Sequence, residues 1–142
     1  MKKVTLASCT LMLGIFCYGQ KVKEADVPAA VKQALKKNFT QVKEVKWEKE
    51  DGKFEVNFEQ GDHEMSAVFT PSGMLEETEM EIKVNELPSV ITTYISNNYK
   101  GAKGKEAAKI TKANGEVNYE AEVKVSDLIF DKNGKFIKSV KD

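Results

Sequence analysis

The chain has no arginine, and its only two cysteines, Cys9 and Cys17, lie close to the N-terminus. Its 22 basic residues are therefore all lysines, balanced by 22 acidic residues among 142. Without guanidinium groups the chain lacks the bidentate donors that bind phosphate and guanine, and a neutral chain does not attract polyanions, so we expect no nucleic-acid partner. With 41% hydrophobic and 31% charged residues, the composition is typical of a soluble globular protein and excludes a disordered or multi-span membrane chain.

The N-terminal segment, from Met1 to Gly19, has the features of a signal peptide. Two lysines follow the initial methionine, and residues 4–18 form an uncharged, mainly apolar run that is shorter than a membrane span of ~20 residues. We predict cleavage after Gly19 or one residue later, and a periplasmic or secreted protein with no membrane span in the mature chain. The letters of a lipoprotein box precede Cys9, but only five residues separate it from Lys3, so lipid anchoring is the less favoured alternative.

Loss of this segment would change the composition. The mature chain would keep 20 lysines against 22 acidic residues, a net charge of about −2, and no cysteine. It could then form no disulfide, thiol nucleophile or thiolate metal site.

The rest of the sequence consists of one pattern written twice. The segment Val27-Pro28-Ala29-Ala30-Val31 recurs as Leu87-Pro88-Ser89-Val90-Ile91, 60 positions later, and Gly73 is matched by Gly134, 61 positions later. This period is long for a solenoid and indicates a duplicated small domain. We predict a signal peptide over residues 1–19, a first repeat over 20–84 and a second repeat over 85–142.

Each repeat is predicted to begin with a helix and to continue as a sheet. Apolar residues recur every fourth position from Val27 to Phe39 and from Leu87 to Tyr99, as on one face of a helix, and the prolines suit its first turn, with caps one or two residues earlier. Four alternating segments separated by short turns follow each helix and predict antiparallel meanders. The fold class is therefore α+β, a helix plus a four-stranded meander twice over, with the two sheets joined edge to edge or tightly packed.

These motifs resemble a known family. The Val-Pro-x-Ala-Val segment, the run from Trp47 to Val56, the Phe-x-x-x-Gly hairpin and Glu86-Leu87-Pro88 resemble the beta-lactamase-inhibitor-like, PepSY-like secreted proteins of Bacteroidetes-type bacteria, over nearly all of residues 21–142. The resemblance implies tandem PepSY-like modules that form one curved sheet with helices on its convex side, similar to the architecture of the beta-lactamase inhibitory protein. It implies no catalytic residue, cofactor or ligand, and a shared fold does not establish a shared function.

The strand alternation predicts an acidic sheet face on the side away from the helices. Glutamates alternate with apolar residues, so the face opposite Met80 and Ile82, and opposite Phe54, Val56 and Phe58, should carry carboxylates. Such glutamates can keep an open sheet soluble, form a partner surface, bind a hard cation or act in glycosidase chemistry. Trp47 is expected in the core beneath the helix or, if exposed, as an interface anchor. The candidate partner surface consists of Glu55, Glu59, Glu77, Glu79, Glu81 and Trp47.

No catalytic, cofactor-binding or metal-binding set is found in the sequence. His63, the only histidine, falls in a predicted turn without the second histidine of a zinc-protease helix, and Ser72 lies in a Pro-Ser-Gly turn. The segment from Asp131 to Gly134 lacks the distal ligands of a calcium loop and is predicted to be a hairpin turn.

Three hypotheses for function follow. The first is a non-enzymatic, monomeric binding module that holds a peptide, a protein or an envelope component on the open sheet face, with preference for a basic partner. The second is an inhibitor or chaperone of an exported hydrolase or peptidase. The third is an enzyme that uses paired carboxylates, for which a buried, convergent acid pair would be the distinguishing observation and a fully solvated set would exclude it.

Overall fold

The computed structural model describes residues 19–102 and 104–141. The predicted signal peptide, apart from Gly19, lies outside the described residues, as do both cysteines. The elements, in chain order, are β1 (Gln20–Val22), a 3₁₀ turn (Glu24–Asp26), α1 (Ala29–Asn38), β2 (Lys43–Glu50), β3 (Lys53–Gln60), β4 (His63–Phe69), β5 (Leu75–Ile82), a 3₁₀ turn (Val84–Glu86), α2 (Ser89–Asn98), β6 (Ala107–Lys112), β7 (Val117–Val123), β8 (Ser126–Asp131) and β9 (Phe136–Lys141).

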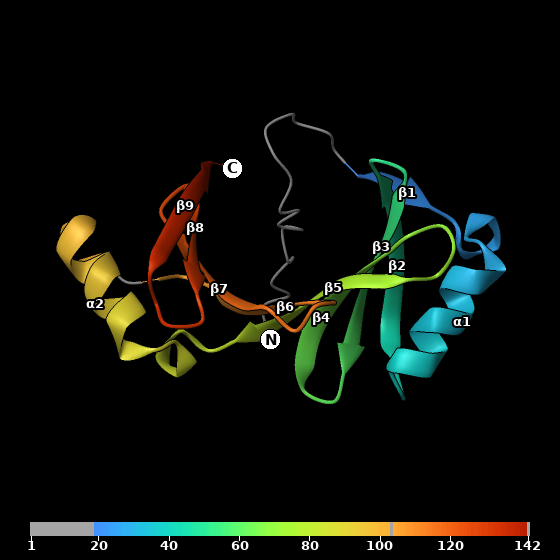
Figure 1. Ribbon diagram of the computed structural model, residues 1–142, viewed down its shortest axis with the longest axis horizontal. Coiled ribbons are helices and arrows are strands. Elements are labelled where there is room, and N and C mark those ends of the chain that lie inside the picture. The colour runs from blue at the N-terminus through green and yellow to red at the C-terminus, as the bar shows by residue number, and fades with distance from the viewer. Residues whose placement is uncertain (1–18, 103, 142) are drawn as a thin grey trace.

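All nine strands of the described residues form one antiparallel sheet, in which each strand pairs with the next along the chain from β1 to β9. The sheet is strongly bent, so that β2–β4 form one arm, β7–β9 form the other, and β5 and β6 join the arms (Figure 1). The helix α1 covers the outside of the first arm and α2 the outside of the second. The predicted α+β class, the two helix-plus-meander units and their edge-to-edge junction are therefore confirmed.

Both helices start in the same way. The carbonyl of Pro28 accepts hydrogen bonds from the amides of Val31 and Lys32, and the carbonyl of Pro88 accepts from those of Ile91 and Thr92. The prolines thus occupy the N-cap position and not the first helical turn, one or two residues later than the predicted caps. A proline is compatible with this place because helix entry requires no hydrogen bond from its nitrogen.

The hairpin that follows the third strand of each unit packs tightly beneath the helix. The turns at Thr70–Gly73 and Asp131–Gly134 make the same pair of backbone hydrogen bonds. Gly73 and Gly134 have φ angles of +87° and +81°, and a Cβ on Gly73 would lie 2.7 Å from the carbonyl oxygen of Ala30. Glycine is therefore required for two reasons: the left-handed backbone and the close contact with the helix. The predicted turn at Asn133-Gly134 is confirmed.

Two hydrophobic cores fill the space between the helices and the sheet. In the first, Val31 and Leu35 of α1 belong to the same cluster as Trp47, Val56 and other apolar residues of β3 and β4. In the second, Ile91 and Ile95 of α2 belong to a cluster with apolar side chains of β6–β8. Because one sheet face packs against both helices, the other face is left for other contacts.

The structure differs from the sequence prediction at three places. The first is β1, a short edge strand that pairs with β2 and has no repeat equivalent. The second is a bulge in β2, where Glu44 has a φ of +51° and the register shifts, so that Val45 is exposed although Trp47 is buried. The third is the end of β7, because the alternation continues through Val125 but the chain turns at Lys124, whose φ is +62°.

Candidate functional site

The open face is the sheet surface opposite the two helices, on the inside of the bend (Figure 1). The pairing register confirms that the predicted acids share this face, because Glu79 pairs with Ser66 on β4 and Ile110 on β6, while the core residues Met65 and Ala67 pair with Met80 and Thr78. The candidate acids on the open face are Glu55 and Glu59 of β3 and Glu77, Glu79 and Glu81 of β5, with Glu120 and Glu122 of β7.

The middle of this face is buried, which corrects the expectation that its glutamates are solvated. Glu79 is only 9% exposed, and Glu55, Glu120 and Asp127 are also buried. Burial raises the pKa of the Glu79 carboxyl well above its ordinary value of 4.5. Neighbouring carboxylates from four strands raise this pKa further, in the order Glu120, Glu55, Glu77 and Asp127. The acids therefore converge, although they come from strands that are far apart in the sequence.

The acids at the margin of the face are more accessible. Glu59 is exposed, and Glu77 and Glu81 are half-buried. Burial raises the pKa of Glu77, an effect that the charge of Lys112 opposes. Burial and the charges of two nearby glutamates also raise the pKa of Glu81. The face thus has a buried acidic centre with a partly solvated margin.

Two asparagines lie in the same transverse row of the face as Glu79. Asn57 of β3 pairs with Ser66 and Asn118 of β7 pairs with Ile110, the two residues that flank Glu79 across the sheet. The Oδ1 atoms of both asparagines are buried and have no hydrogen-bond partner. Buried acceptors of this kind are rare in folded proteins, because an unmade hydrogen bond costs free energy.

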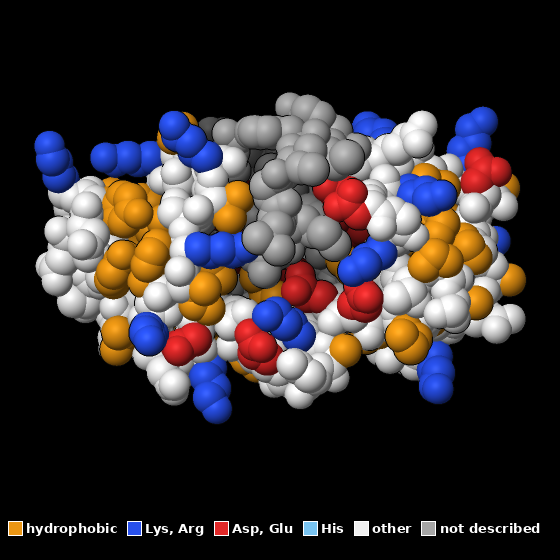
Figure 2. Space-filling model, turned by 45° about the horizontal axis from the view of Figure 1, so that its top comes forward, with side chains coloured by type: hydrophobic (Ala, Val, Ile, Leu, Met, Phe, Trp, Pro, Cys, Tyr) orange, Lys and Arg blue, Asp and Glu red, His pale blue; other side chains and the backbone are white. Residues whose placement is uncertain are grey.

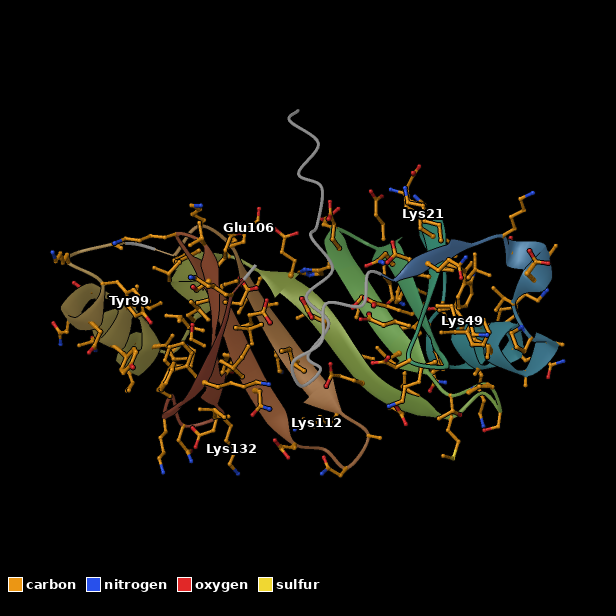
Figure 3. The ribbon with its side chains drawn as sticks, turned by 90° about the horizontal axis from the view of Figure 1, so that it is seen from above. Lys21, Lys49, Tyr99, Glu106, Lys112 and Lys132 are labelled. Carbon is orange, nitrogen blue, oxygen red and sulfur yellow. The ribbon has the colours of Figure 1, made fainter. Side chains whose placement is uncertain are left out.

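Only part of the margin is neutralised by lysine. Acidic side chains gather near the middle of the molecule in Figure 2, with lysines between them and at both ends. In Figure 3, Lys21 lies at one end of the sheet and Lys132 toward the other, while Lys112 lies near the middle. Lys53 forms an ion pair with Glu76 and Lys105 forms one with Glu122. Neither of these pairs involves Glu79.

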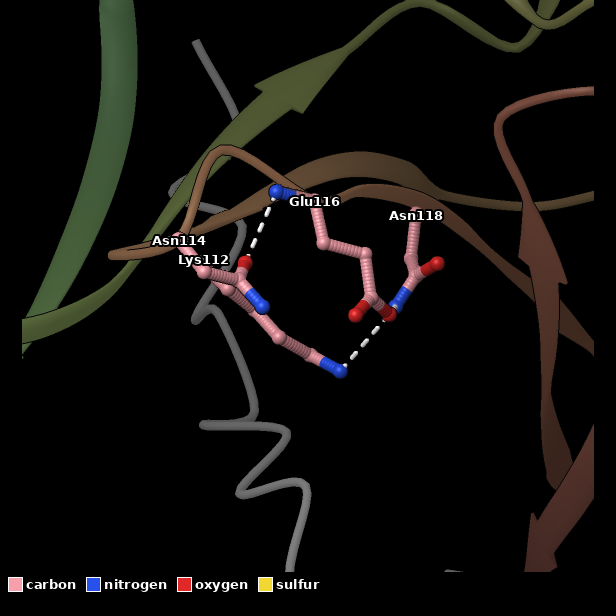
Figure 4. Close-up of polar contacts among 4 residues, drawn as sticks. All are labelled: Lys112, Asn114, Glu116 and Asn118. Atoms are coloured by element: carbon pink, nitrogen blue, oxygen red, sulfur yellow. Dashed lines mark hydrogen bonds and ion pairs between the residues drawn. The ribbon is translucent and has the colours of Figure 1, made fainter.

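A small polar cluster lies at the end of the β6–β7 hairpin (Figure 4). The Nζ atom of Lys112 lies 2.8 Å from Oε1 of Glu116, which also accepts a hydrogen bond of 3.1 Å from Nδ2 of Asn118. The carbonyl oxygen of the Asn114 side chain accepts a hydrogen bond from the amide of Glu116. These contacts fix the orientation of Asn118, because its Nδ2 is engaged at the hairpin while its Oδ1 has no donor.

Trp47 is not part of this face. It is 5% exposed and belongs to the core beneath α1, so its place on the candidate partner surface is wrong and the core alternative is confirmed. His63 is exposed, as predicted, although it is the first residue of β4 and pairs with Gln60. The segment from Asp131 to Gly134 is a hairpin whose aspartate accepts two backbone hydrogen bonds.

Sequence reasoning missed the amides of Asn57 and Asn118 and the carboxylate of Asp127. The alternation placed both asparagines on the open face, but only the structure shows that their oxygens lack donors. Within residues 19–102 and 104–141, no group of three or more His, Cys, Asp or Glu side chains is arranged to hold a metal ion. No helix in the same residues is long and apolar enough to cross a membrane.

Comparison with known proteins agrees with this architecture. The family described as "Putative beta-lactamase-inhibitor-like, PepSY-like" matches residues 14–75 and 53–138, two overlapping segments that span most of the chain. A comparison with curated proteins found no match.

Solved structures from Bacteroides species share the fold. A protein from Bacteroides eggerthii described as a putative periplasmic protein has a TM-score of 0.74 at 13% identity, over 81% of this chain and 88% of its own. A DUF2874 family protein from Bacteroides uniformis has a TM-score of 0.72 at 16% identity, over 80% and 88%. A BLIP-like protein from Bacteroides fragilis has a TM-score of 0.68 at 21% identity, over 80% and 86%. At these identities the likeness establishes the fold alone.

Proposed function

The chain belongs to this beta-lactamase-inhibitor-like, PepSY-like family, and we propose that it is a non-enzymatic, exported binding protein that holds a basic peptide or protein loop on its open face. The observation that carries the proposal is the convergence of Glu55, Glu79 and Glu120 in the middle of a sheet face that no helix of the described residues covers. Carboxylates that repel one another are stabilised by a partner that brings positive charge. The partner is therefore expected to carry cationic side chains.

The proposed location is the periplasm or the cell exterior. The N-terminal sequence has the order of charges and apolar residues of a signal peptide, and a structural neighbour of the same fold is described as periplasmic. Without residues 1–19 the chain has no cysteine, so it can work in an oxidising compartment as a single chain without disulfides.

The test is the binding of the protein without residues 1–19 to an array of random nine-residue peptides. All described strands and helices begin after residue 19, so this form contains every one of them. We expect bound peptides to be enriched in lysine or arginine, and binding to weaken as the salt concentration rises. A lack of enrichment in basic residues would contradict the proposal.

A matched pair of triple variants assigns the binding to the open face. The test variant is Glu59→Gln, Glu77→Gln and Glu81→Gln, which neutralises three accessible acids of the face. The control variant is Glu24→Gln, Asp26→Asn and Asp62→Asn, which neutralises three exposed acids elsewhere. We expect at least a tenfold loss of binding in the test variant and little change in the control. Equal binding by both variants would place the interaction elsewhere.

Two other functions remain outcomes of direct assays. A BLIP-like neighbour makes inhibition of an exported hydrolase the natural activity to measure, and full hydrolase activity in excess protein would argue against it. The buried, convergent acids around Glu79 are the observation that distinguishes a carboxylate enzyme, and the raised pKa of Glu79 is a property of a catalytic general acid. Turnover of chromogenic glycosides that Glu79→Gln abolishes would favour an enzyme over a binding protein.

A further inference from the structure

A row of three acceptor side chains crosses the middle of the open face. Asn57, Glu79 and Asn118 lie in line on β3, β5 and β7, separated by Ser66 and Ile110 on the strands between them. Glu79 is only 9% exposed, and its surroundings act on its carboxyl through burial and the like charges of four neighbouring acids. The Oδ1 atoms of Asn57 and Asn118 are buried without a donor.

The chemistry of this row specifies a ligand rich in donors. The amide oxygens of Asn57 and Asn118 can only accept hydrogen bonds, and a positive charge beside Glu79 favours the ionised form of its carboxyl, which also only accepts. Bringing an acceptor or an anion to the row would leave both asparagine oxygens unsatisfied. An ammonium group carries three donors, no acceptor and a positive charge, so it supplies both the donors that the asparagine oxygens lack and the charge that the carboxylates favour.

The spacing of the row fits an extended peptide that runs across the strands. Adjacent strands are about 4.8 Å apart, so Glu79 lies roughly 10 Å from each asparagine along the row. An extended chain of the polyproline II type advances about 3.1 Å per residue and has three residues per turn, so three residues span that distance and point the same way. A peptide with one side chain at Glu79 therefore brings donors of its third neighbour on either side to Asn57 and Asn118.

We infer that this row is a subsite for the lysine side chain of an extended peptide segment, with the ammonium group at Glu79. The inference rests on the proposed function, because it requires a peptide on the open face. Lysine fits better than arginine because its three donors rotate freely toward acceptors on different strands, whereas the planar guanidinium needs a coplanar pair of acceptors. A metal ion is disfavoured because the described carboxylates do not form a chelating group.

The experiment uses peptide arrays in which only the central residue is fixed. Nine-residue peptides carry lysine, acetyl-lysine, norleucine or arginine at the centre, with mixed residues elsewhere, and are probed with the protein without residues 1–19. Acetylation removes the charge and two donors while the side chain keeps its length. We expect lysine-centred peptides to bind at least tenfold more protein than acetyl-lysine or norleucine peptides, and several-fold more than arginine peptides.

Two single variants locate the preference. Glu79→Gln should remove the preference for lysine, since it neutralises the carboxylate with little change of shape. Glu24→Gln removes the same charge from an exposed position outside the open face and should keep the preference. A thermal unfolding curve for each variant confirms that both are folded under the conditions of the array.

The outcomes separate this inference from the proposed function. If lysine and acetyl-lysine peptides bind equally while the triple face variant still loses binding, the lysine subsite is wrong but the proposal of binding on the open face is supported. If arginine peptides bind as well as lysine peptides, or if Glu79→Gln keeps the preference, the ammonium assignment is wrong. If no peptide of any set binds, the proposed function fails as well.

Discussion

The two halves of the chain place their helices on the sheet with the same backbone contacts but fill the space between with different side chains. Trp47 on β2 and Ala107 on β6 occupy equivalent positions of the two repeats, and they pair with Val56 and Ala121 respectively. On the helices, Ala34 and Tyr94 are equivalent in the same way. The large ring therefore belongs to the sheet in the first half and to the helix in the second.

In each half, one large ring and one alanine occupy this pair of positions, so the repeat keeps the ring but not its place on the sheet or the helix. Tyr94 stacks on Phe136 with ring centroids 5.2 Å apart and meets Phe130 edge-on at 5.4 Å. In the first half, a tilted pair of Phe39 and Phe58 at 4.8 Å takes the comparable role. Cores tolerate such exchanges when size and pattern are kept.

The largest effect is expected for Trp47→Ala, which breaks the first half of this comparison. Removal of the buried indole leaves a cavity and should lower the free energy of unfolding by about 3–5 kcal/mol. Urea denaturation followed by far-UV circular dichroism measures this change, since the only tryptophan is lost.

The double variant Trp47→Ala with Ala34→Tyr moves the ring to the helix, as in the second half. Ala34→Tyr alone should cost about 1–3 kcal/mol through overpacking. The double variant should be more stable than the sum of the single effects predicts, because the two changes compensate in volume. If the free-energy changes of the two single variants simply add, a ring on the helix cannot replace the ring on the sheet in the first half.

A smaller effect, of about 2–4 kcal/mol, is expected for Gly73→Ala in the first hairpin. The added Cβ meets the backbone carbonyl of Ala30 at 2.7 Å, and the φ of +87° is unfavourable for alanine. In the equivalent Gly134→Ala the added Cβ meets Cβ of Val90 at 3.0 Å, so the cost should be lower because this contact is less close than the one at Gly73.

The control for the hairpins is Gly52→Ala, where φ is +77° and no atom lies within 4 Å of the added Cβ. It should cost only the backbone term, about 1–2 kcal/mol. Thermal unfolding of the three variants should rank Gly73→Ala as the least stable and Gly52→Ala as the most stable. Equal losses at all three would mean that contact with the helices contributes nothing.

The repeat made most of the fold predictable from sequence. Paired Val-Pro and Leu-Pro segments, helical spacing and turn glycines indicated both units because local backbone preferences determine them. The bulge at Glu44 and the turn at Lys124 were missed, since neither residue belongs to a type that favours positive φ. The acidic face followed from alternation, but the burial of Glu79 and the orphaned oxygens of two asparagines depend on the bend of the sheet, which no local pattern encodes.

The fourth strands of the two units, β5 and β9, show the sharpest functional difference. Glu77 and Glu79 on β5 correspond in the repeat to Lys138 and Val140 on β9, with the same register shift beside each pair. β5 lies in the middle of the sheet and β9 at its edge. A buried carboxylate at the centre does not stabilise the fold, so Glu79→Gln and Glu79→Val, which copies β9, test what Glu79 costs.

Both variants should be more stable than the parent protein at pH 7.5, by about 1.4 kcal/mol for each unit by which burial and like charges raise the pKa of Glu79. The sign follows from the raised pKa of Glu79. Above its ordinary pKa of 4.5, the folded state keeps a proton that the unfolded state has released, so this group lowers stability as pH rises toward its folded pKa and has no effect at lower pH. The gap between parent and Glu79→Gln should therefore widen from pH 4 to pH 7.5.

Urea midpoints at pH 4.0, 5.5 and 7.5 measure this difference in stability. The control is Glu24→Gln, an exposed position, whose stability should not diverge from that of the parent as the pH rises. The groups that face Glu79 are Glu55 on β3, Glu77 on β5, Glu120 on β7 and Asp127 on β8, together with the uncharged Ser66 and Ile110 on β4 and β6. All four acids remain in the variant, so their own titration contributes to both curves. A constant difference in stability across the three pH values would mean that the pKa of Glu79 is not raised in the folded state. The buried acid on β5 would then destabilise the fold no more than the equivalent valine on β9.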